Sequence, residues 1–448
     1  MQKYTLIKDG IIVNQGQKYR GSILIEEGII KQIFKKDLPQ NIIEQSAIIN
    51  AKDKIVLPGI IDSHVHFRDP GLTNKANIYT ESRAAVAGGI TSFMDMPNTI
   101  PPATNHKLLE QKFEIASKQS LANYSFYLGA TNSNIEEIVN TNPKNICGIK
   151  VFMGASTGNM MVDRDKLELI FSKSPLLIAT HCEDNGIIEQ NIIKYKNIFG
   201  ENPPINYHTK IRNEEACFKS TSLAIKLANK HNTRLHVLHI STGKELELFD
   251  NKLPSKNKLI TAETCIHHLW FNEDDYGKFG NKIRWNPSVK TKKDNEALLK
   301  GLKNNTVDII STDHAPHTIN EKEGSYFNSM SGGPMVQHSL QAMLEFYFQD
   351  KLSLETIVEK MCHTPADIFN INKRGYLKEG YNADIIIVDP NKKTKVTKEN
   401  ILYKCKWSTF EGYTFGSTVS HTFINGNLVY ENGKFNDKNL GKRLVFDR

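Results

Sequence analysis

The sequence contains little cysteine, with six residues among 448. They are far apart and none lies in a CxxC pair, which excludes both a disulfide framework and a cysteine cage for zinc. We expect buried thiols at Cys147, Cys182, Cys217, Cys265, Cys362 and Cys405.

Long apolar runs are also absent. No stretch approaches the roughly 20 consecutive apolar residues that span a bilayer, and the N-terminus, MQKYTLIKDG, lacks the apolar core of a signal peptide. With 39% hydrophobic and 24% charged residues and a mean hydropathy of -0.42, the composition is typical of a water-soluble globular protein. We therefore expect a cytoplasmic protein with no membrane partner.

The net charge of +8 is not concentrated in any basic block. The lysines are scattered, and the longest clusters are doublets such as Lys35-Lys36 and Lys392-Lys393. This pattern favours a solvated surface over a nucleic-acid-binding face.

Both ends of the chain contain short runs in which apolar and polar residues alternate, a pattern that predicts β-strands. At the N-terminus these are residues 4–13, 21–26 and 29–34; at the C-terminus they are residues 383–388, 419–424 and 428–430. Asn425-Gly426 between the last two predicts a tight hairpin turn.

Between these ends, from residue 58 to 370, short apolar strands alternate with helical periodicity. The strand candidates are residues 59–66, 90–96, 124–129, 146–152, 176–181, 234–240, 259–266 and 307–313. Helices are expected between them, for example at 79–87, 108–118, 164–172, 214–231 and 295–303. This α/β pattern predicts a closed (β/α)8 TIM-like barrel. A doubly wound open sheet is the competitor, but no GxGxxG follows the first strand.

The predicted strands end in unusually polar residues. In a barrel these ends meet at one mouth, where active sites lie. His64 and His66 are two apart and share a strand face, while His181, His239 and Asp313 end other strands. A lone buried histidine is usually a core residue, but packing does not explain such convergence, so we predict a metal centre.

Lys150 stands inside the apolar run GIKVF. Burial would lower its pKa and leave a nucleophilic amine, which can react with CO2 to give a carbamate able to bridge two cations. The alternative is a lysine that forms an ion pair with Asp313.

Several longer motifs carry a resemblance to a known family. The segments DSHVHFRDPG at 62–71, AGGITS at 87–92, MPNT at 96–99, STDHAPH at 311–317 and GYNAD at 380–384 resemble the dihydroorotase family of the amidohydrolase superfamily. The resemblance covers nearly the whole chain. It implies a metal-dependent hydrolase barrel over residues 58–370, and a small β-sandwich built from residues 1–57 and 371–448.

The resemblance also implies roles for individual residues. Two Zn²⁺ ions would be held by His64, His66, His181, His239, Asp313 and an N6-carboxylated Lys150 that bridges them. The substrate would contact Arg68, Asn98, Asn286 and His317, and Asp313 would be the catalytic proton carrier. One bacterial group of the family has an aspartate in place of Lys150, whereas hydantoinases and another dihydroorotase group use the carboxylated lysine.

The implied reaction is the reversible cyclisation of N-carbamoyl-L-aspartate to (S)-dihydroorotate and water in pyrimidine (UMP) synthesis. The expected binding partner of the protein is the small-molecule substrate, N-carbamoyl-L-aspartate or dihydroorotate. A homo-oligomer is compatible with the sequence. Two alternatives remain. A hydantoinase or allantoinase would share the metal ligands but not need the guanidinium of Arg68 for a substrate carboxylate. A non-catalytic scaffold subunit would have lost metal ligands, and none is missing.

Overall fold

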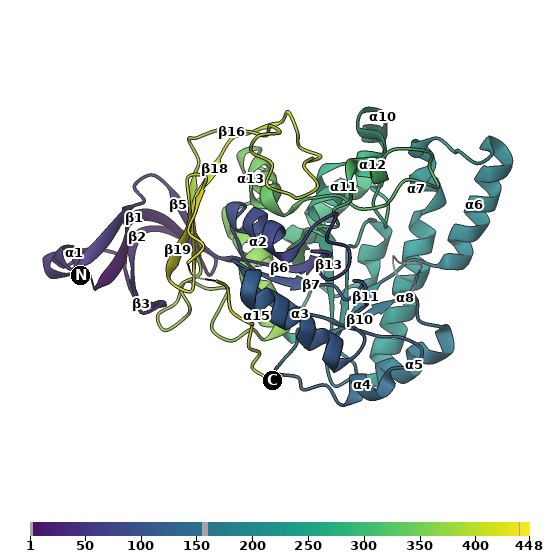
Figure 1. Cartoon of the computed structure of the whole chain (residues 1–448), viewed down its shortest axis with the longest axis horizontal. Helices are drawn as coiled ribbons and strands as arrows, with labels where there is room; N and C mark the ends of the chain where they lie inside the picture. The colour runs from purple at the N-terminus through teal and green to yellow at the C-terminus, as the bar shows by residue number, and fades with distance from the viewer. Residues whose placement is uncertain (1–2, 155–159, 439) are drawn as a thin grey trace.

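The computed structural model describes residues 3–154, 160–438 and 440–448. A sheet built from both chain ends lies on one side, and a barrel surrounded by helices lies on the other (Figure 1). The sequence prediction of a barrel with a smaller β-unit from the chain ends is therefore confirmed.

The barrel strands are parallel, and their residues are almost all buried, which explains their near-continuous apolar sequences. They are β6 (Ile60–Val65), β7 (Ile90–Asp95), β8 (Asn123–Phe126) with β9 (Leu128–Gly129), β10 (Ile149–Phe152), β11 (Ile178–His181), β12 (Leu235–Val237), β13 (Ile260–Cys265) and β14 (Ile309–Ser311). Between the first and last strands, Val65 pairs with His314, and the His66 N–H donates to the His314 carbonyl oxygen at 2.8 Å. These contacts close the barrel.

The third barrel strand differs from the single run expected at 124–129. It is divided at Tyr127 into β8, which pairs with β7, and β9, which pairs with β10. The Tyr127 N–H donates to the Asp95 carbonyl oxygen at 3.1 Å. The strand is divided where the chain changes its pairing partner, which the local sequence does not encode.

The helices begin at polar caps. Asn77, Asn105 and Asn213 each accept a backbone N–H from the first turn, which satisfies a donor left open at the helix start. The helices are α1 (Gln40–Glu44), α2 (Ile78–Ala87), α3 (His106–Gln119), α4 (Ile135–Val139), α5 (Arg164–Lys173), α6 (Asn185–Phe199), α7 (His208–Ile211), α8 (Glu214–His231), α9 (Ile266–Trp270), α10 (Tyr276–Phe279), α11 (Lys292–Lys303), α12 (Ile319–Lys322), α13 (Ser339–Phe348), α14 (Leu354–Val358) and α15 (Thr364–Phe369). No helix within the described ranges is both long and apolar enough to cross a membrane.

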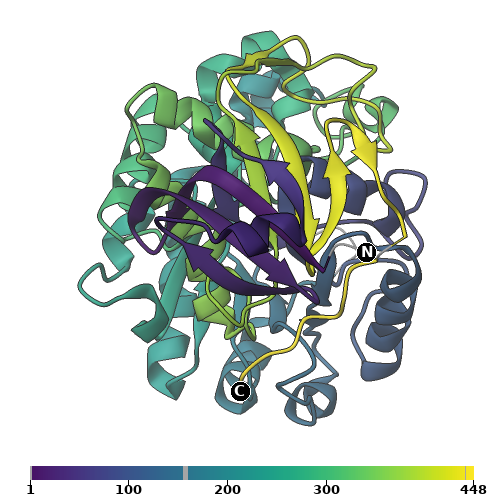
Figure 2. The ribbon, with the colours of Figure 1, turned by 90° about the vertical axis from the view of Figure 1, so that its left-hand side faces the viewer.

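A nine-stranded sheet combines the two chain ends, and Figure 2 shows its purple N-terminal and yellow C-terminal strands lying together. Its strands are β1 (Tyr4–Asn14), β2 (Gln17–Glu26), β3 (Ile29–Phe34), β4 (Ser46–Asn50), β5 (Ile55–Pro58), β15 (Ile385–Asp389), β18 (Thr418–Ile424), β19 (Asn427–Glu431) and β20 (Lys434–Phe435). A separate short pair consists of β16 (Thr394–Lys395) and β17 (Thr414–Phe415). Ile12, Ile23, Ile385 and Phe423 share one apolar cluster, so residues from both ends form one core. The predicted hairpin turn joins β18 to β19, with positive φ at Asn425 and Gly426.

The last residues of the chain, 441–448, cover the end of the barrel where its strands begin. The Tyr124 N–H donates to the Lys442 carbonyl oxygen at 3.0 Å, and the Leu444 N–H donates to the Tyr124 carbonyl oxygen at 2.9 Å. Leu444 and Phe446 are each 1% exposed and share an apolar cluster with residues of β7 and β11. The C-terminal segment thus seals the barrel end opposite the polar strand ends.

Replacement of Phe446 tests this seal. Phe446→Ala should lower the free energy of unfolding by about 3 kcal/mol because it leaves a cavity in that cluster. Val445, which is 58% exposed, provides the matched control. Val445→Ala should change the free energy of unfolding by less than about 0.5 kcal/mol. The measurement is urea denaturation, and equal shifts for both variants would show that the segment does not seal the barrel.

Candidate metal centre and active site

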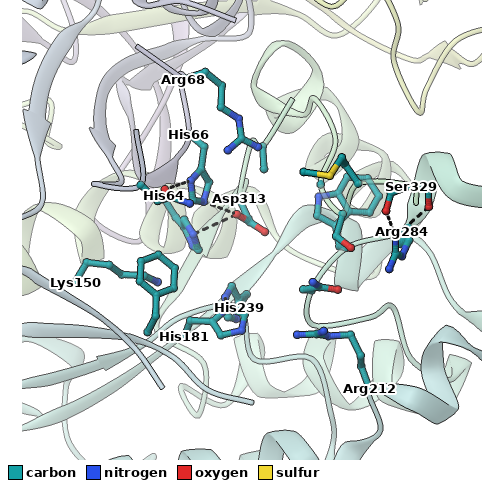
Figure 3. A pocket seen from close by; sticks show the side chains of 18 residues that line it. His64, His66, Arg68, Lys150, His181, Arg212, His239, Arg284, Asp313 and Ser329 are labelled. Carbon is teal, nitrogen blue, oxygen red and sulfur yellow. Dashed lines mark hydrogen bonds and ion pairs between the residues drawn. The ribbon is translucent and has the colours of Figure 1, made fainter. Parts of the chain in front are cut away.

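A cavity of about 470 Å³ lies at the carboxyl ends of the barrel strands (Figure 3). Most of its lining is polar or charged, and it includes all the predicted site residues except His317. The lining residues are His64, His66, Arg68, Asn98, Lys150, Phe152, His181, Arg212, His239, Arg284, Trp285, Asn286, Asp313, Ala315, Ser329, Met330, Ser331 and Gly332.

Three of the predicted metal ligands form a compact group. The Nε2 atoms of His64 and His66 each lie 3.2 Å from Oδ1 of Asp313. All three side chains are at most 10% exposed. Burial would raise the pKa of Asp313, but the two imidazoles reverse this effect and hold the pKa below its usual value. Asp313 is therefore a carboxylate at neutral pH.

Hydrogen bonds on the other ring nitrogens set the tautomers of the two histidines. Nδ1 of His64 donates to Oε1 of Glu263 at 2.8 Å, and Nδ1 of His66 donates to Oδ1 of Asn98 at 2.8 Å. A neutral imidazole with its proton on Nδ1 has a free lone pair on Nε2. Since both Nε2 atoms face the Asp313 carboxylate, this donor set fits a divalent cation.

A second pair of imidazoles lies beside this group. Nδ1 of His181 and Nε2 of His239 are 2.9 Å apart, and burial lowers the pKa of both rings, which keeps them neutral. Nε2 of His181 lies 3.1 Å from Oε2 of Glu183, whose carboxylate also accepts from Nε of Arg212 at 3.0 Å. With Nε2 of His181 bonded to Glu183, its Nδ1 is available as a ligand, so this pair also fits a divalent cation.

Lys150 lies near both groups of histidines (Figure 3). It is 1% exposed and forms no ion pair with any described residue. The alternative pairing with Asp313 is not found; Oδ1 of Asp313 contacts His64 and His66. Burial lowers the pKa of Lys150 to about 7. A substantial fraction is therefore the neutral amine near neutral pH, the form that reacts with CO2.

Three site residues have left-handed backbone conformations, with φ of 66° at Arg68, 40° at His239 and 43° at Asp313. Each follows a barrel strand. Such φ values are uncommon for residues with a Cβ and occur where the surrounding structure enforces them. The backbone turns at these points and brings the three side chains to the same cavity.

Arg68 is a buried cation without an acidic partner. It is 3% exposed, and no carboxylate of a described residue lies within ion-pair distance. Its Nε donates to the Pro316 carbonyl oxygen at 3.1 Å, and its Nη2 donates to Nε2 of His317 at 3.1 Å. The remaining guanidinium donors are available to an anion in the cavity.

The other predicted substrate contacts have different positions. Asn98 and Asn286 line the cavity, and Oδ1 of Asn286 has no hydrogen-bond partner among the described residues. His317 lies behind Arg68 and outside the cavity lining, and its Nδ1 is 3.2 Å from Nζ of Lys75. In this arrangement His317 orients Arg68.

Sequence reasoning did not identify several charged residues of the site. The sequence gives a weak indication for Glu263, because a carboxylate inside a predicted buried strand is unusual. Burial would raise its pKa, but the neighbouring imidazoles, first that of His64, hold it well below its usual value. Glu183 had the same signal as the ligands, since it follows His181 by two residues, and Arg284 is two residues from the predicted Asn286. Arg212 has no such signal, because only the fold places it at the cavity.

Comparison with known proteins agrees with this geometry. The family model described as "Amidohydrolase family" matches residues 55–429. The chain belongs to the amidohydrolase family. A dihydroorotase from Methanosphaera stadtmanae is 34% identical over 411 residues, covering 91% of this chain and 92% of the relative. A dihydroorotase from Pyrococcus furiosus is 31% identical over 441 residues, covering 98% and 96%.

Among solved structures, an L-hydantoinase (dihydropyrimidinase) from Arthrobacter aurescens is similar, with a TM-score of 0.91 and 26% identity. The match covers 98% of this chain and 99% of the hydantoinase chain. Together these similarities place the chain among the cyclic amidohydrolases of the dihydroorotase and hydantoinase group, which act on small molecules.

Replacement of the carboxylate behind His64 should weaken metal binding. Glu263→Gln keeps the shape but removes the charge that supports the His64 tautomer, so the dissociation constant for Zn²⁺ should rise about 10- to 100-fold. The measurement is competition with a chromophoric chelator.

Glu245→Gln is the matched control. Glu245 is 2% exposed and accepts from Thr221 and Thr242 at 2.9 Å, without touching a predicted metal ligand. An unchanged dissociation constant in Glu263→Gln, or equal changes in both variants, would contradict a role in orienting His64.

Proposed function

We propose that this enzyme is a dihydroorotase, which interconverts N-carbamoyl-L-aspartate and (S)-dihydroorotate. The observation that carries the proposal is Arg68, a buried guanidinium that borders the same cavity as the histidine cluster and has no carboxylate partner among the described residues. A buried cation of this kind favours a ligand that brings its own carboxylate. Dihydroorotate has such a group, whereas hydantoin does not.

The proposal includes two zinc ions. His64, His66 and Asp313 would hold one, and His181 and His239 the other, with Lys150 as the shared ligand after its Nζ forms a bond to the carbon of CO2 and loses a proton to solvent. When bound, the ions supply Lewis acidity that activates water and stabilises negative charge on the amide oxygen. The absence of an ion pair at Lys150 among the described residues supports its modification.

The protein side chains orient the substrate and move the proton. Arg68 and Asn98 would hold the ring carboxylate, and the free Oδ1 of Asn286 would accept from a ring N–H. In hydrolysis, a water oxygen bonds to the amide carbon and the carbon–nitrogen bond breaks. Asp313 would receive the proton that the water loses and deliver it to the departing ring nitrogen. Ring closure reverses these steps.

Removal of the Arg68 cation distinguishes a dihydroorotase from a hydantoinase. Arg68→Met should lower kcat/KM for dihydroorotate by about 100-fold or more, equivalent to about 3 kcal/mol, because a buried charge-assisted contact is lost. Turnover of hydantoin, measured with the same preparations, is the control and should change far less.

An equal loss of kcat/KM for dihydroorotate and hydantoin would show that Arg68 has a structural role instead. Wild-type enzyme that hydrolyses hydantoin and not dihydroorotate would overturn the proposed activity and favour the hydantoinase alternative.

Metal content tests the bridging lysine. Wild-type protein should hold close to two divalent ions per chain, and Lys150→Ala should lose both the ions and activity, as measured by elemental analysis and dihydroorotate turnover. A small carboxylic acid added to Lys150→Ala should partly restore both, because its oxygens replace those of the carbamate.

Lys150→Arg provides the matched comparison, and the acid should not rescue it, since the guanidinium still fills the site. An unmodified Lys150 in fully active enzyme, shown by native mass spectrometry, would refute the bridge.

A further inference from the structure

Lys322, at the end of α12, carries a buried amine that the proposed reaction does not use. It is 2% exposed and has no ion pair with a described residue. Its Nζ donates to three carbonyl oxygens, those of Met330 at 2.7 Å, Gly332 at 2.7 Å and Arg284 at 3.2 Å. An ammonium group has three N–H donors, so these three acceptors satisfy it completely.

The three carbonyl groups belong to two segments that are distant in sequence and form one wall of the cavity. Residues 284–286 and 329–332 both line it, and Figure 3 shows Arg284 beside Ser329, across the cavity from Lys150 and His64. The segments also contact each other directly. The Gly332 N–H donates to the Arg284 carbonyl oxygen at 2.8 Å, and Nη1 of Arg284 donates to Oγ of Ser329 at 3.0 Å.

The backbone of this wall has little freedom at its base. Gly332 has a φ of 121°, and a Cβ there would lie 2.5 Å from the Ala315 carbonyl oxygen, so only glycine fits. The Ala315 N–H donates to the Gly333 carbonyl oxygen at 3.0 Å, which ties residues 332–333 to the end of the last barrel strand. Lys322 bonds to the same segment through the carbonyl oxygens of Gly332 and Met330, and among the described side chains it alone also joins them to the carbonyl oxygen of Arg284.

Three carbonyl dipoles that converge on one point repel one another and, once buried, need a donor. Burial, with the nearby Arg284 and Arg68, lowers the pKa of this amine, and its three hydrogen bonds offset the cost of burying it. Without the amine, these carbonyl groups would lose their shared donor, and the two segments would move apart or admit water.

We propose that Lys322 is a positioning residue that holds segments 284–286 and 329–332 together as the substrate-binding wall of the cavity. The inference rests on the proposed cyclic-amide substrate but not on the metal centre, because Lys322 contacts none of the predicted metal ligands. It assigns to Lys322 an effect on substrate binding that is separable from the chemical step.

The test compares Lys322→Met with Lys360→Met. Lys360 is also a fully buried lysine, with Nζ bonded to Oδ1 of Asn305 at 2.7 Å, but it lies outside the cavity lining. Lys322→Met should raise KM for dihydroorotate at least tenfold while kcat falls less than threefold and zinc content stays at the wild-type level. Lys360→Met should leave KM unchanged, even if its melting temperature falls as much as that of Lys322→Met.

A second readout does not depend on activity. Hydrogen exchange of the Met330 and Gly332 amides, which donate to the carbonyl oxygens of Glu321 and Arg284, should accelerate at least tenfold in Lys322→Met. Exchange in α11 should not change. Lys322→Arg, which keeps a charged donor, should give intermediate values of both KM and exchange.

Several results would overturn the proposal: an unchanged KM, unchanged exchange at residues 330–332, or loss of zinc from Lys322→Met. If Lys322→Met does not fold, Lys322→Gln, which donates at most two hydrogen bonds, takes its place with the same expected direction. If the wild-type enzyme turns over hydantoin and not dihydroorotate, the proposed function fails, and the KM comparison made with hydantoin still decides the role of Lys322.

Discussion

His64 lies between two buried carboxylates, and the arrangement of the centre depends on this contact. Glu263 accepts from Nδ1 at 2.8 Å, while Asp313 lies 3.2 Å from Nε2. The first contact fixes the tautomer, and the second directs the free lone pair to the same point as that of His66. Because Glu263 comes from β13 and Asp313 follows β14, the contact requires a closed barrel that brings these strand ends to the first strand.

The site concentrates charge that a protein interior normally excludes. Lys150 and Arg68 are buried without acidic partners among the described residues, and the backbone at Arg68, His239 and Asp313 is left-handed. Such features lower stability and persist only where the rest of the fold supplies a surplus. The apolar interior of the barrel supplies this surplus of stabilising free energy. The segment that contains Phe446 seals that interior at the end opposite the site.

The cavity has two sides with different physical origins. The predicted metal ligands stand on or directly after barrel strands, whose hydrogen-bonded ladders hold them rigidly. The wall at 284–286 and 329–332 comes from loops, and backbone hydrogen bonds with Lys322 hold its two segments together. The predicted metal ligands and this wall thus come from different kinds of structure, the strand ends and the loops.

The sequence pattern by itself determined the barrel, the strands at both chain ends and the polar residues that follow the barrel strands, whereas the union of the two ends in one β-unit came from the family resemblance. The first three features depend on short-range periodicity, since a strand of buried residues and the side chain at its end are neighbours in sequence. The assignment of Arg68 and Asn98 came from the family resemblance and not from this periodicity. The structure brings the predicted ligands to one cavity, as the polar strand ends indicated.

Only the tertiary structure decided which distant groups meet. It placed Glu263 behind His64, Glu183 between His181 and Arg212, and His317 behind Arg68 rather than on the cavity surface. It also divided the third barrel strand at Tyr127 and gathered three carbonyl groups around Lys322. Each depends on contacts between segments far apart in the chain, whose geometry follows from packing and not from local pattern.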